Sequence, residues 1–292
     1  MPELPYIAVY VECLARRVTG QPLQAIRLAN PFVLRSVSPT VGQVCGRRVN
    51  GVTRLGKRIV LALEGGAFAV LHLMIACRLH WRAPGAKIPG KVGLVAFDFP
   101  LGMLVLTEAG TKRRAWLRLV EGEAALHALD PGGLDPLEAD LAAFHQALTR
   151  ESHTVKRALT DPRLFSGIGN AYSDEILHRA RLSPVKRTAQ LSAEEVERLH
   201  RACRDTLVEW TDRLRADAGD GFPEGVTAFR TEMAVHGRFG KPCPVCAAPV
   251  QRIVYADNEC NYCARCQTGS RLLADRALSR LLKEYWPRTL PE

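Results

Sequence analysis

Two cysteine pairs near the C-terminus constrain the fold of this chain more than any other feature. Two residues separate Cys243 from Cys246 and Cys263 from Cys266, and sixteen residues lie between the pairs. Such pairs are typical of a tetrahedral four-cysteine zinc site on a small β-ribbon. Four thiolates leave no free coordination position, so one structural zinc ion per chain is expected. Cys260 could compete as a ligand, but its use would break the symmetry of the pairs, and we leave it out.

Length and charge narrow the class of protein. A chain of 292 residues is long enough for two domains with their own cores. Forty Lys and Arg against thirty Asp and Glu give a net charge of +10, which favours a polyanionic partner, nucleic acid before an acidic membrane surface. A basic surface with no specific partner is the alternative. An odd number of cysteines, nine, argues against a disulfide framework. The sequence has no apolar run of membrane-spanning length and no signal-peptide pattern, which predicts a cytoplasmic protein without a membrane partner.

The first three residues are a candidate covalent catalyst. If Met1 is removed, the chain begins with the secondary amine of Pro2 beside the carboxylate of Glu3. A nucleophilic amine must be unprotonated, and α-amines have a pKa of about 7.7–8, against about 10.4 for lysine. A chain can also begin Met-Pro for no chemical reason, so the pair needs support from the rest of the sequence.

The N-terminal half is expected to be a β-sandwich that follows one helix. Apolar residues recur every three or four positions from Ile7 to Val18, which predicts an amphipathic helix. From about Leu23 to Val120 the chain consists of short β-type runs, several of which form hairpins around glycine-containing turns. The predicted hairpin strands are Arg58–Leu63, Ala67–Leu73, Val92–Phe99 and Met103–Leu106.

A change of pattern at Asp130-Pro131-Gly132-Gly133 predicts a domain boundary, beyond which the chain becomes helical. Leu137, Leu141, Phe144 and Leu148 share one helical face, and a second helix is expected from Asn170 to Arg181. The longest predicted helix begins at Ser192, with Glu195 completing a capping box. The segment from Arg271 to Trp286 also has roughly helical spacing.

The turn before the second helix is a candidate anion site. Gly167 and Gly169 allow backbone N–H groups to approach an anion at the helix N-terminus, and Asn170 is expected to cap the helix. An ordinary helix–helix turn is the alternative. In a basic chain with a zinc ribbon, a DNA phosphate is the favoured occupant.

Together these motifs resemble the formamidopyrimidine-DNA glycosylase and endonuclease VIII family. The similar segments occur in the order of the family from residue 2 to about residue 267. They are Pro2–Pro5, Arg54–Arg58, His72–Leu73, Thr154–Lys156, Gly167–Tyr172, Val235–Arg238 and the four-cysteine ribbon.

The resemblance implies an α+β multidomain fold. It consists of an N-terminal β-sandwich with an N-terminal helix, a helical helix-two-turn-helix domain, and a four-cysteine zinc-finger β-ribbon, with DNA in the cleft between domains. On this sequence we place the catalytic domain at residues 1–129, the helical DNA-binding domain at 130–230 and the zinc finger at 231–270. Residues 271–292 lie beyond the usual end of the family and are expected to form a helical tail.

The resemblance also implies a reaction. Pro2 would attack C1′ of a damaged nucleoside, expel an oxidised base and form a Schiff base that promotes strand cleavage at the abasic (AP) site. Glu3 would act as general acid and base at the sugar. Lys57, which we count with the catalytic residues, and Asn170 would hold phosphates beside the lesion. The partner would be damaged or abasic DNA, bound by a monomer that associates with the nucleoid. The predicted DNA-binding residues are His72, Lys112, Arg113, Arg114, Lys156, Gly167, Gly169, Asn170, Arg238 and Asn258.

Departures from the family pattern concern recognition of the base. Tyr6 stands where the family usually has Glu, and residues 74–77 read Met-Ile-Ala-Cys where Gly-Met-Ser-Gly is common. Residues 108–114 lack the usual aromatic wedge, so that Lys112, Arg113 and Arg114 could either probe the duplex or be solvated charges. Asn258 stands near the position of an arginine that contacts phosphate. These changes keep two alternatives open: a DNA-binding protein that has lost base excision, and a glycosylase for bulky, alkylated or crosslinked bases.

Overall fold

The computed structural model describes residues 1–227, 229–255, 258–285 and 287–290 and divides the chain into two compact units. The first unit contains Met1–Pro131 and Trp210–Val226, and the second contains Gly132–Glu209 and Thr227–Glu292. Helix α7 (Ala193–Ala218) contributes residues to both units. The predicted domain limits at residues 129, 230 and 270 stay predictions. Among the described residues, no helix is both long and apolar enough to span a membrane.

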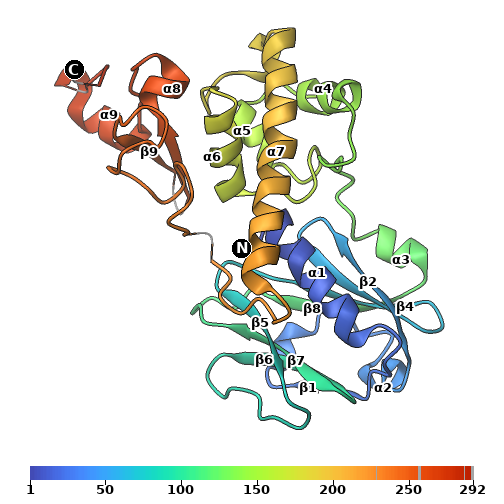
Figure 1. The fold of residues 1–292 in the computed structure, drawn as a ribbon. Helices are drawn as coiled ribbons and strands as arrows, with labels where there is room; N and C mark the ends of the chain where they lie inside the picture. The colour runs from blue at the N-terminus through green and yellow to red at the C-terminus, as the bar shows by residue number, and fades with distance from the viewer. Residues whose placement is uncertain (228, 256–257, 286, 291–292) are drawn as a thin grey trace. The chain divides into compact units, whose positions relative to one another are not determined.

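The first unit is a β-sandwich, as the sequence predicted (Figure 1). One antiparallel sheet has the strand order β1-β6-β7-β5 and the other the order β2-β3-β4-β8. Both predicted hairpins are confirmed, as β3–β4 and β6–β7. The strands are β1 (Ala25–Leu28), β2 (Val49–Leu55), β3 (Arg58–Leu63), β4 (Ala67–His72), β5 (Cys77–Arg82), β6 (Gly93–Phe99), β7 (Gly102–Glu108) and β8 (Trp116–Glu121).

The N-terminal helix α1 (Leu4–Val18) is held by the core of the sandwich. Its apolar face includes Ile7, Leu14 and Val18, which are all fully buried, and the helix packs against β2 and β3. Burying each such side chain is worth about 1.5–3 kcal/mol, so the start of the chain is firmly anchored. The helix begins before the predicted start at Ile7, because Pro5 is tolerated in the first turn of a helix. The short helices of this unit are η1 (Pro31–Val33), α2 (Val41–Val44) and α3 (Glu123–His127).

The second unit begins with a helical bundle. It contains α4 (Leu141–Thr149), α5 (Val155–Thr160), α6 (Asn170–Arg179), η2 (Thr188–Gln190) and the first part of α7. The capping box at α7 is confirmed, since Ser192 and Glu195 exchange hydrogen bonds of 3.0 and 3.2 Å. The helical stripe predicted from Leu137 is shorter than expected, because the side chain of Asp140 accepts a bond from Ala143 N and starts α4 after Leu137.

A two-stranded ribbon follows in the second unit. Strands β9 (Val250–Tyr255) and β10 (Asn258–Cys263) are antiparallel, and α8 (Ala264–Thr268) continues directly from β10. In the described part of the tail, α9 (Arg276–Leu282) and the 3-10 turn η3 (Lys283–Tyr285) take the place of the one helix expected from Arg271 to Trp286. The expected helix is interrupted because Arg271 pairs with Thr289 and Leu272 N bonds to Arg288 O, which folds the tail back on itself.

Candidate active site and metal centre

The first residues of the chain and the β2–β3 turn form one polar group in the first unit. Pro2 is buried, and Glu3, which is only 5% exposed, immediately precedes α1. Lys57 lies in the tight turn between Leu55 and Arg58, where Gly56 adopts φ +62°. The charges of Glu3 and Lys57 both act on the α-amino group, which in this structure belongs to Met1. The structure therefore brings together the three predicted catalytic residues.

This environment lowers the pKa of the α-amino group below its ordinary value of 8.0. Burial is the largest cause, Glu3 opposes it, and the positive charges of Lys57 and Arg78 add to the lowering. Burial likewise lowers the pKa of Lys57, against the opposing effect of Glu3. A low-pKa amine beside a carboxylate is the arrangement that a nucleophilic amine with a general acid and base requires.

His72 lies at the end of β4, beside the turn that carries Lys57. Its ring stacks on Trp116 at a centroid distance of 5.2 Å, and the guanidinium of Arg58 lies 5.5 Å from the centre of the Trp116 ring. Burial, followed by the charges of Arg58 and Lys57, lowers the pKa of His72 to about 4. Within the described residues, the buried Nδ1 atom of His72 has no hydrogen-bond partner. A neutral ring in this position can still donate a hydrogen bond to an anion.

The segment after β7 keeps its basic side chains at the surface. The buried carboxylate of Glu108 accepts the backbone N–H groups of Arg114 and Ala115 at 3.1 and 3.2 Å, which fixes the base of the loop. Lys112, Arg113 and Arg114 are exposed, and Arg113 donates to Lys91 O. Exposure agrees with both interpretations of these residues. By contrast Tyr6, on α1, is buried in the core of the sandwich.

In the second unit, the Gly167–Asn170 turn leads into α6. Gly167 has φ +84°, a conformation that favours glycine. The expected capping role of Asn170 is wrong, because Gly169 occupies the cap position and Asn170 is the first helical residue. Its side chain instead donates from Nδ2 to Glu259 O on β10 at 2.8 Å. The turn is therefore tied to the ribbon.

Lys156 on α5 forms an ion pair with Asp174 on α6. Its Nζ atom donates to Asp174 Oδ1 at 2.5 Å and to Ser173 Oγ at 2.9 Å. Asp174 is 1% exposed, and a buried carboxylate requires such a partner. The second carboxylate oxygen accepts from His236 Nδ1 at 2.8 Å and from Asn261 N at 3.1 Å. Lys156 thus neutralises the buried carboxylate of Asp174, whose hydrogen bond with Asn261 links α6 to the ribbon.

The segment before the first cysteine pair is fixed by Glu175. This buried carboxylate accepts the backbone N–H groups of Ala234, Val235 and His236 at 2.7–2.9 Å. Arg238, in the following turn, is half-buried and donates from Nη1 to Thr231 O at 2.6 Å. The side chain of Asn258 lies outside the described part of the chain.

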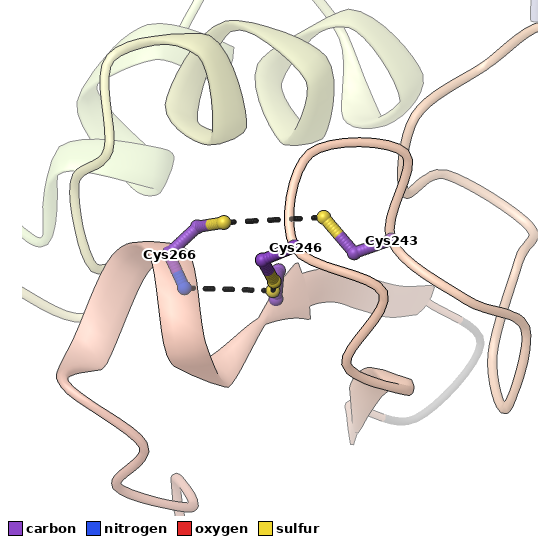
Figure 2. Close-up of side chains that lie close together, drawn as sticks. Cys243, Cys246 and Cys266 are labelled. Carbon is purple, nitrogen blue, oxygen red and sulfur yellow. Dashed lines mark hydrogen bonds between the residues drawn. The ribbon is translucent and has the colours of Figure 1, made fainter.

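The four paired cysteines lie close together, and Figure 2 shows three of them, Cys243, Cys246 and Cys266, grouped at one site. Their Sγ atoms all lie within 4.8 Å of one another, and the Cys243–Cys266 and Cys246–Cys263 separations are 3.9 and 3.4 Å. Four sulfurs bound tetrahedrally at about 2.3 Å from zinc would be about 3.8 Å apart, so the set could hold this ion. Cys260 packs in a separate apolar cluster with Ile253 and Tyr262, in agreement with its exclusion.

Sequence reasoning missed the polar residues of α6 that contact the ribbon. Asp174, Glu175 and His178 are all buried, and each interacts with the segment from residue 234 to 266. The available signal was the adjacent carboxylates of Asp174 and Glu175 in the middle of an otherwise buried helix. Buried acids are paired as a rule, so both of them require partners. Their partners lie about sixty or more residues away along the chain, where no local pattern indicates them.

Two family models match the chain. The formamidopyrimidine-DNA glycosylase N-terminal domain matches residues 1–115, and the formamidopyrimidine-DNA glycosylase H2TH domain matches residues 133–213. The formamidopyrimidine-DNA glycosylase of Thermus thermophilus is 34% identical over 279 residues, which cover 91% of this chain and 98% of the relative. An uncharacterised formamidopyrimidine-DNA glycosylase-like protein of Mycobacterium tuberculosis is 42% identical over 156 residues, 53% of this chain and 95% of that protein.

Solved structures are similar over the same extent. The MutM (Fpg) protein of Thermus thermophilus is 32% identical and superposes with a TM-score of 0.76, covering 91% of this chain and 98% of that one. The Fpg protein of Lactococcus lactis, solved in complex with DNA that contains an abasic site, has a TM-score of 0.80 at 23% identity, with 91% and 99% coverage. At that identity the second likeness supports the fold alone.

Proposed function

This chain belongs to the formamidopyrimidine-DNA glycosylase family, whose members act on oxidised bases in DNA, and we propose that it excises a damaged base through its N-terminal proline. The observation that carries this proposal is the buried α-amine of Met1, whose pKa is lowered and which lies beside Glu3 and Lys57. Removal of Met1 would make Pro2 the terminal amine in this environment. The relatives named above support DNA as the partner, and the net charge of +10 is in keeping with it.

The reaction would proceed by two connected steps. The unprotonated nitrogen of Pro2 attacks C1′ of the damaged nucleoside, the C1′–N bond breaks, and the base leaves with the electron pair. Because proline is a secondary amine, loss of its N–H proton leaves a neutral adduct whose nitrogen lone pair can break the C1′–O4′ bond. O4′ takes up a proton as the sugar ring opens, and the nitrogen and C1′ become a cationic iminium. This electron sink acidifies C2′, so that removal of a C2′ proton expels the 3′ phosphate and cleaves the strand. Glu3 would transfer protons at the sugar, and Lys57 would balance the charge of a phosphate.

Contacts to DNA would position the lesion without reading it. Lys57, His72 and the Gly167–Asn170 turn offer cationic groups or N–H donors for phosphates. Lys112, Arg113 and Arg114 are exposed and would also contact phosphates. Lys156 and Arg238 instead have protein partners, so they would affect DNA binding by holding those partners in position. Asn258 stays a predicted contact. We assign zinc to the four cysteines as a structural ion, because a closed thiolate set has no position for a substrate.

Covalent trapping tests the proposal. Mass spectrometry of the intact protein should show a chain that begins at Pro2, and borohydride reduction in the presence of abasic DNA should yield an adduct that peptide mapping places on Pro2. Glu3→Gln should slow base release about 10²–10⁴-fold, the range typical of a lost general acid or base. Glu64→Gln, at an exposed turn, is the matched control. An adduct on another residue, or none in the wild type, would overturn the proposal.

The burial of Tyr6 supports a second candidate function. A tyrosine packed in the core supplies no carboxylate to a base at this position, so the chain could accept a bulky or alkylated base, or bind damaged DNA without excision. A panel of duplexes with abasic, oxidised-purine, oxidised-pyrimidine and alkylated lesions separates these outcomes. Release of an oxidised base supports the first proposal, release of alkylated bases alone supports the second, and tight binding without release supports a binding protein.

A further inference from the structure

His178 contacts the cysteine site from the last turn of α6. Its side chain is buried, and Nε2 lies 3.2 Å from the Sγ atom of Cys243. No feature of the cysteine spacing predicts this neighbour, because His178 lies in the helical bundle rather than in the ribbon. A buried imidazole aimed at one sulfur of a four-sulfur cluster has three possible roles: a metal ligand, a hydrogen-bond donor to a ligand, or a space-filling ring.

The geometry argues against direct ligation. Among the described residues, the candidate metal-binding group consists of the four cysteine sulfurs, which all lie within 4.8 Å of one another. His178 is not part of this group. Four sulfurs already complete a tetrahedral shell. A metal-bound thiolate has only lone pairs, so a hydrogen bond between Nε2 and Sγ requires the proton to be on the nitrogen. Four thiolates around a divalent cation also carry a net charge of −2, which a hydrogen-bond donor would help to stabilise.

His178 is one of three polar residues on the same stripe of α6. Asn170, Asp174 and His178 are four residues apart, so their side chains project from one face of the helix. Asn170 Nδ2 donates to Glu259 O, Asp174 Oδ2 accepts from Asn261 N, and His178 Nε2 contacts Cys243 Sγ. The first two contacts hold β10, and the third reaches the first cysteine pair.

We propose that His178 is a positioning residue that donates a hydrogen bond from Nε2 to the metal-bound thiolate of Cys243 and thereby fixes the metal centre to helix α6. The inference rests on the metal proposed above at the four cysteines. Through the stripe, the metal centre is joined to the same helix that begins at the candidate anion turn. Removing a single group that hydrogen-bonds to a metal ligand typically lowers metal affinity about 10- to 100-fold.

Two substitutions of opposite character separate donation from packing. His178→Gln keeps an N–H donor at about the reach of Nε2, whereas His178→Phe keeps an aromatic ring and removes the donor. The full-length zinc-loaded proteins are mixed with an excess of a chromogenic chelator, and the rate of zinc release is followed by absorbance. Alkylation of the cysteines by iodoacetamide, read by mass spectrometry at Cys243, gives a second measurement that does not involve enzyme activity.

We expect His178→Phe to release zinc about 10-fold faster or more and to expose Cys243 to alkylation, while His178→Gln stays close to wild type. His145→Phe, at an exposed position of α4, is the matched control and should match wild type. The reverse order, with Phe near wild type and Gln faster, would show that the ring only fills space and would overturn the inference. If the wild type contains no metal at the four cysteines, the proposed zinc centre itself fails, and that result is distinguishable from an altered rate in the variants.

Discussion

The protonation state of the Pro2 nitrogen decides whether the proposed reaction can begin. In the structure, burial lowers the pKa of the Met1 α-amine, Glu3 raises it, and Lys57 lowers it further, and Pro2 would take over these surroundings once Met1 is removed. The reactive form is the free base, so the rate of adduct formation should rise with pH and level off with an inflection below 8.0. Lys57→Met removes a positive charge and should move the inflection upward. Single-turnover trapping on abasic DNA between pH 5 and 9 measures both effects, and a wild-type inflection at or above 8.0 would contradict the lowered pKa.

His72 should make the folded protein sensitive to acid. Its pKa is lowered from 6.5 to about 4, chiefly by burial and then by Arg58 and Lys57. Because the unfolded chain binds this proton more readily, the stability that His72 contributes is present above pH 6.5 and is lost as the pH falls toward 4. The melting temperature of the wild type should therefore fall faster over this range than that of His72→Gln. Zinc loss at low pH affects both proteins, so the decisive quantity is the difference between their two plots of melting temperature against pH. Parallel plots would count against the lowered pKa of His72.

Residues whose role follows from adjacent sequence could be predicted, and those with distant partners could not. The cysteine spacing correctly predicted which four sulfurs converge, and it excluded Cys260. Asn170 was expected to cap its own helix, as the residue type favours, but its partner is Glu259 on the ribbon. A tertiary hydrogen bond of this kind leaves no periodic or local signal, because the two residues are brought together only by folding.

At the scale of elements, the tail from residue 271 onward contacts both strands of the ribbon and braces it. The buried carboxylate of Asp275 accepts Val254 N of β9 at 2.7 Å, and Leu273 N donates to Tyr262 Oη at 2.8 Å. Asp275→Ala leaves a strand N–H without this acceptor and should lower the free energy of unfolding by about 1–3 kcal/mol. Hydrogen exchange at the Val254 amide should also accelerate. Glu284→Ala, at an exposed position of η3, is the control, and unchanged exchange at Val254 would show that the tail is not a brace.

Element prediction succeeded where one apolar period dominates and failed where a polar contact ends the element. Helix α1 follows its hydrophobic pattern because burial against the sandwich selects one face, whereas the hairpin strands β3 and β6 are buried along most of their length and follow their apolar runs between turns. The helical spacing from Arg271 to Trp286 was misleading, since backbone bonds between residues 270–272 and 288–290 reverse the chain. Apolar spacing indicates which residues are compatible with a helix, whereas the ends of the helix depend on contacts formed by the folded unit.

For the whole molecule, the excess of ten positive charges should appear as a salt dependence of DNA binding. Each phosphate neutralised by a cationic side chain contributes a slope of about −0.9 to a plot of log K against log salt concentration on duplex DNA. Lys57→Ala should therefore weaken binding to abasic duplexes and make the slope shallower by about one unit, with a similar change on undamaged DNA. Fluorescence anisotropy from 50 to 300 mM KCl measures the slope.

Lys87→Ala removes the same charge at an exposed loop position outside the predicted contacts and should leave the slope unchanged. A shallow slope in the wild type would argue against phosphate contacts as the source of affinity, whereas equal changes in both variants would assign the effect to net charge rather than to a phosphate held by Lys57.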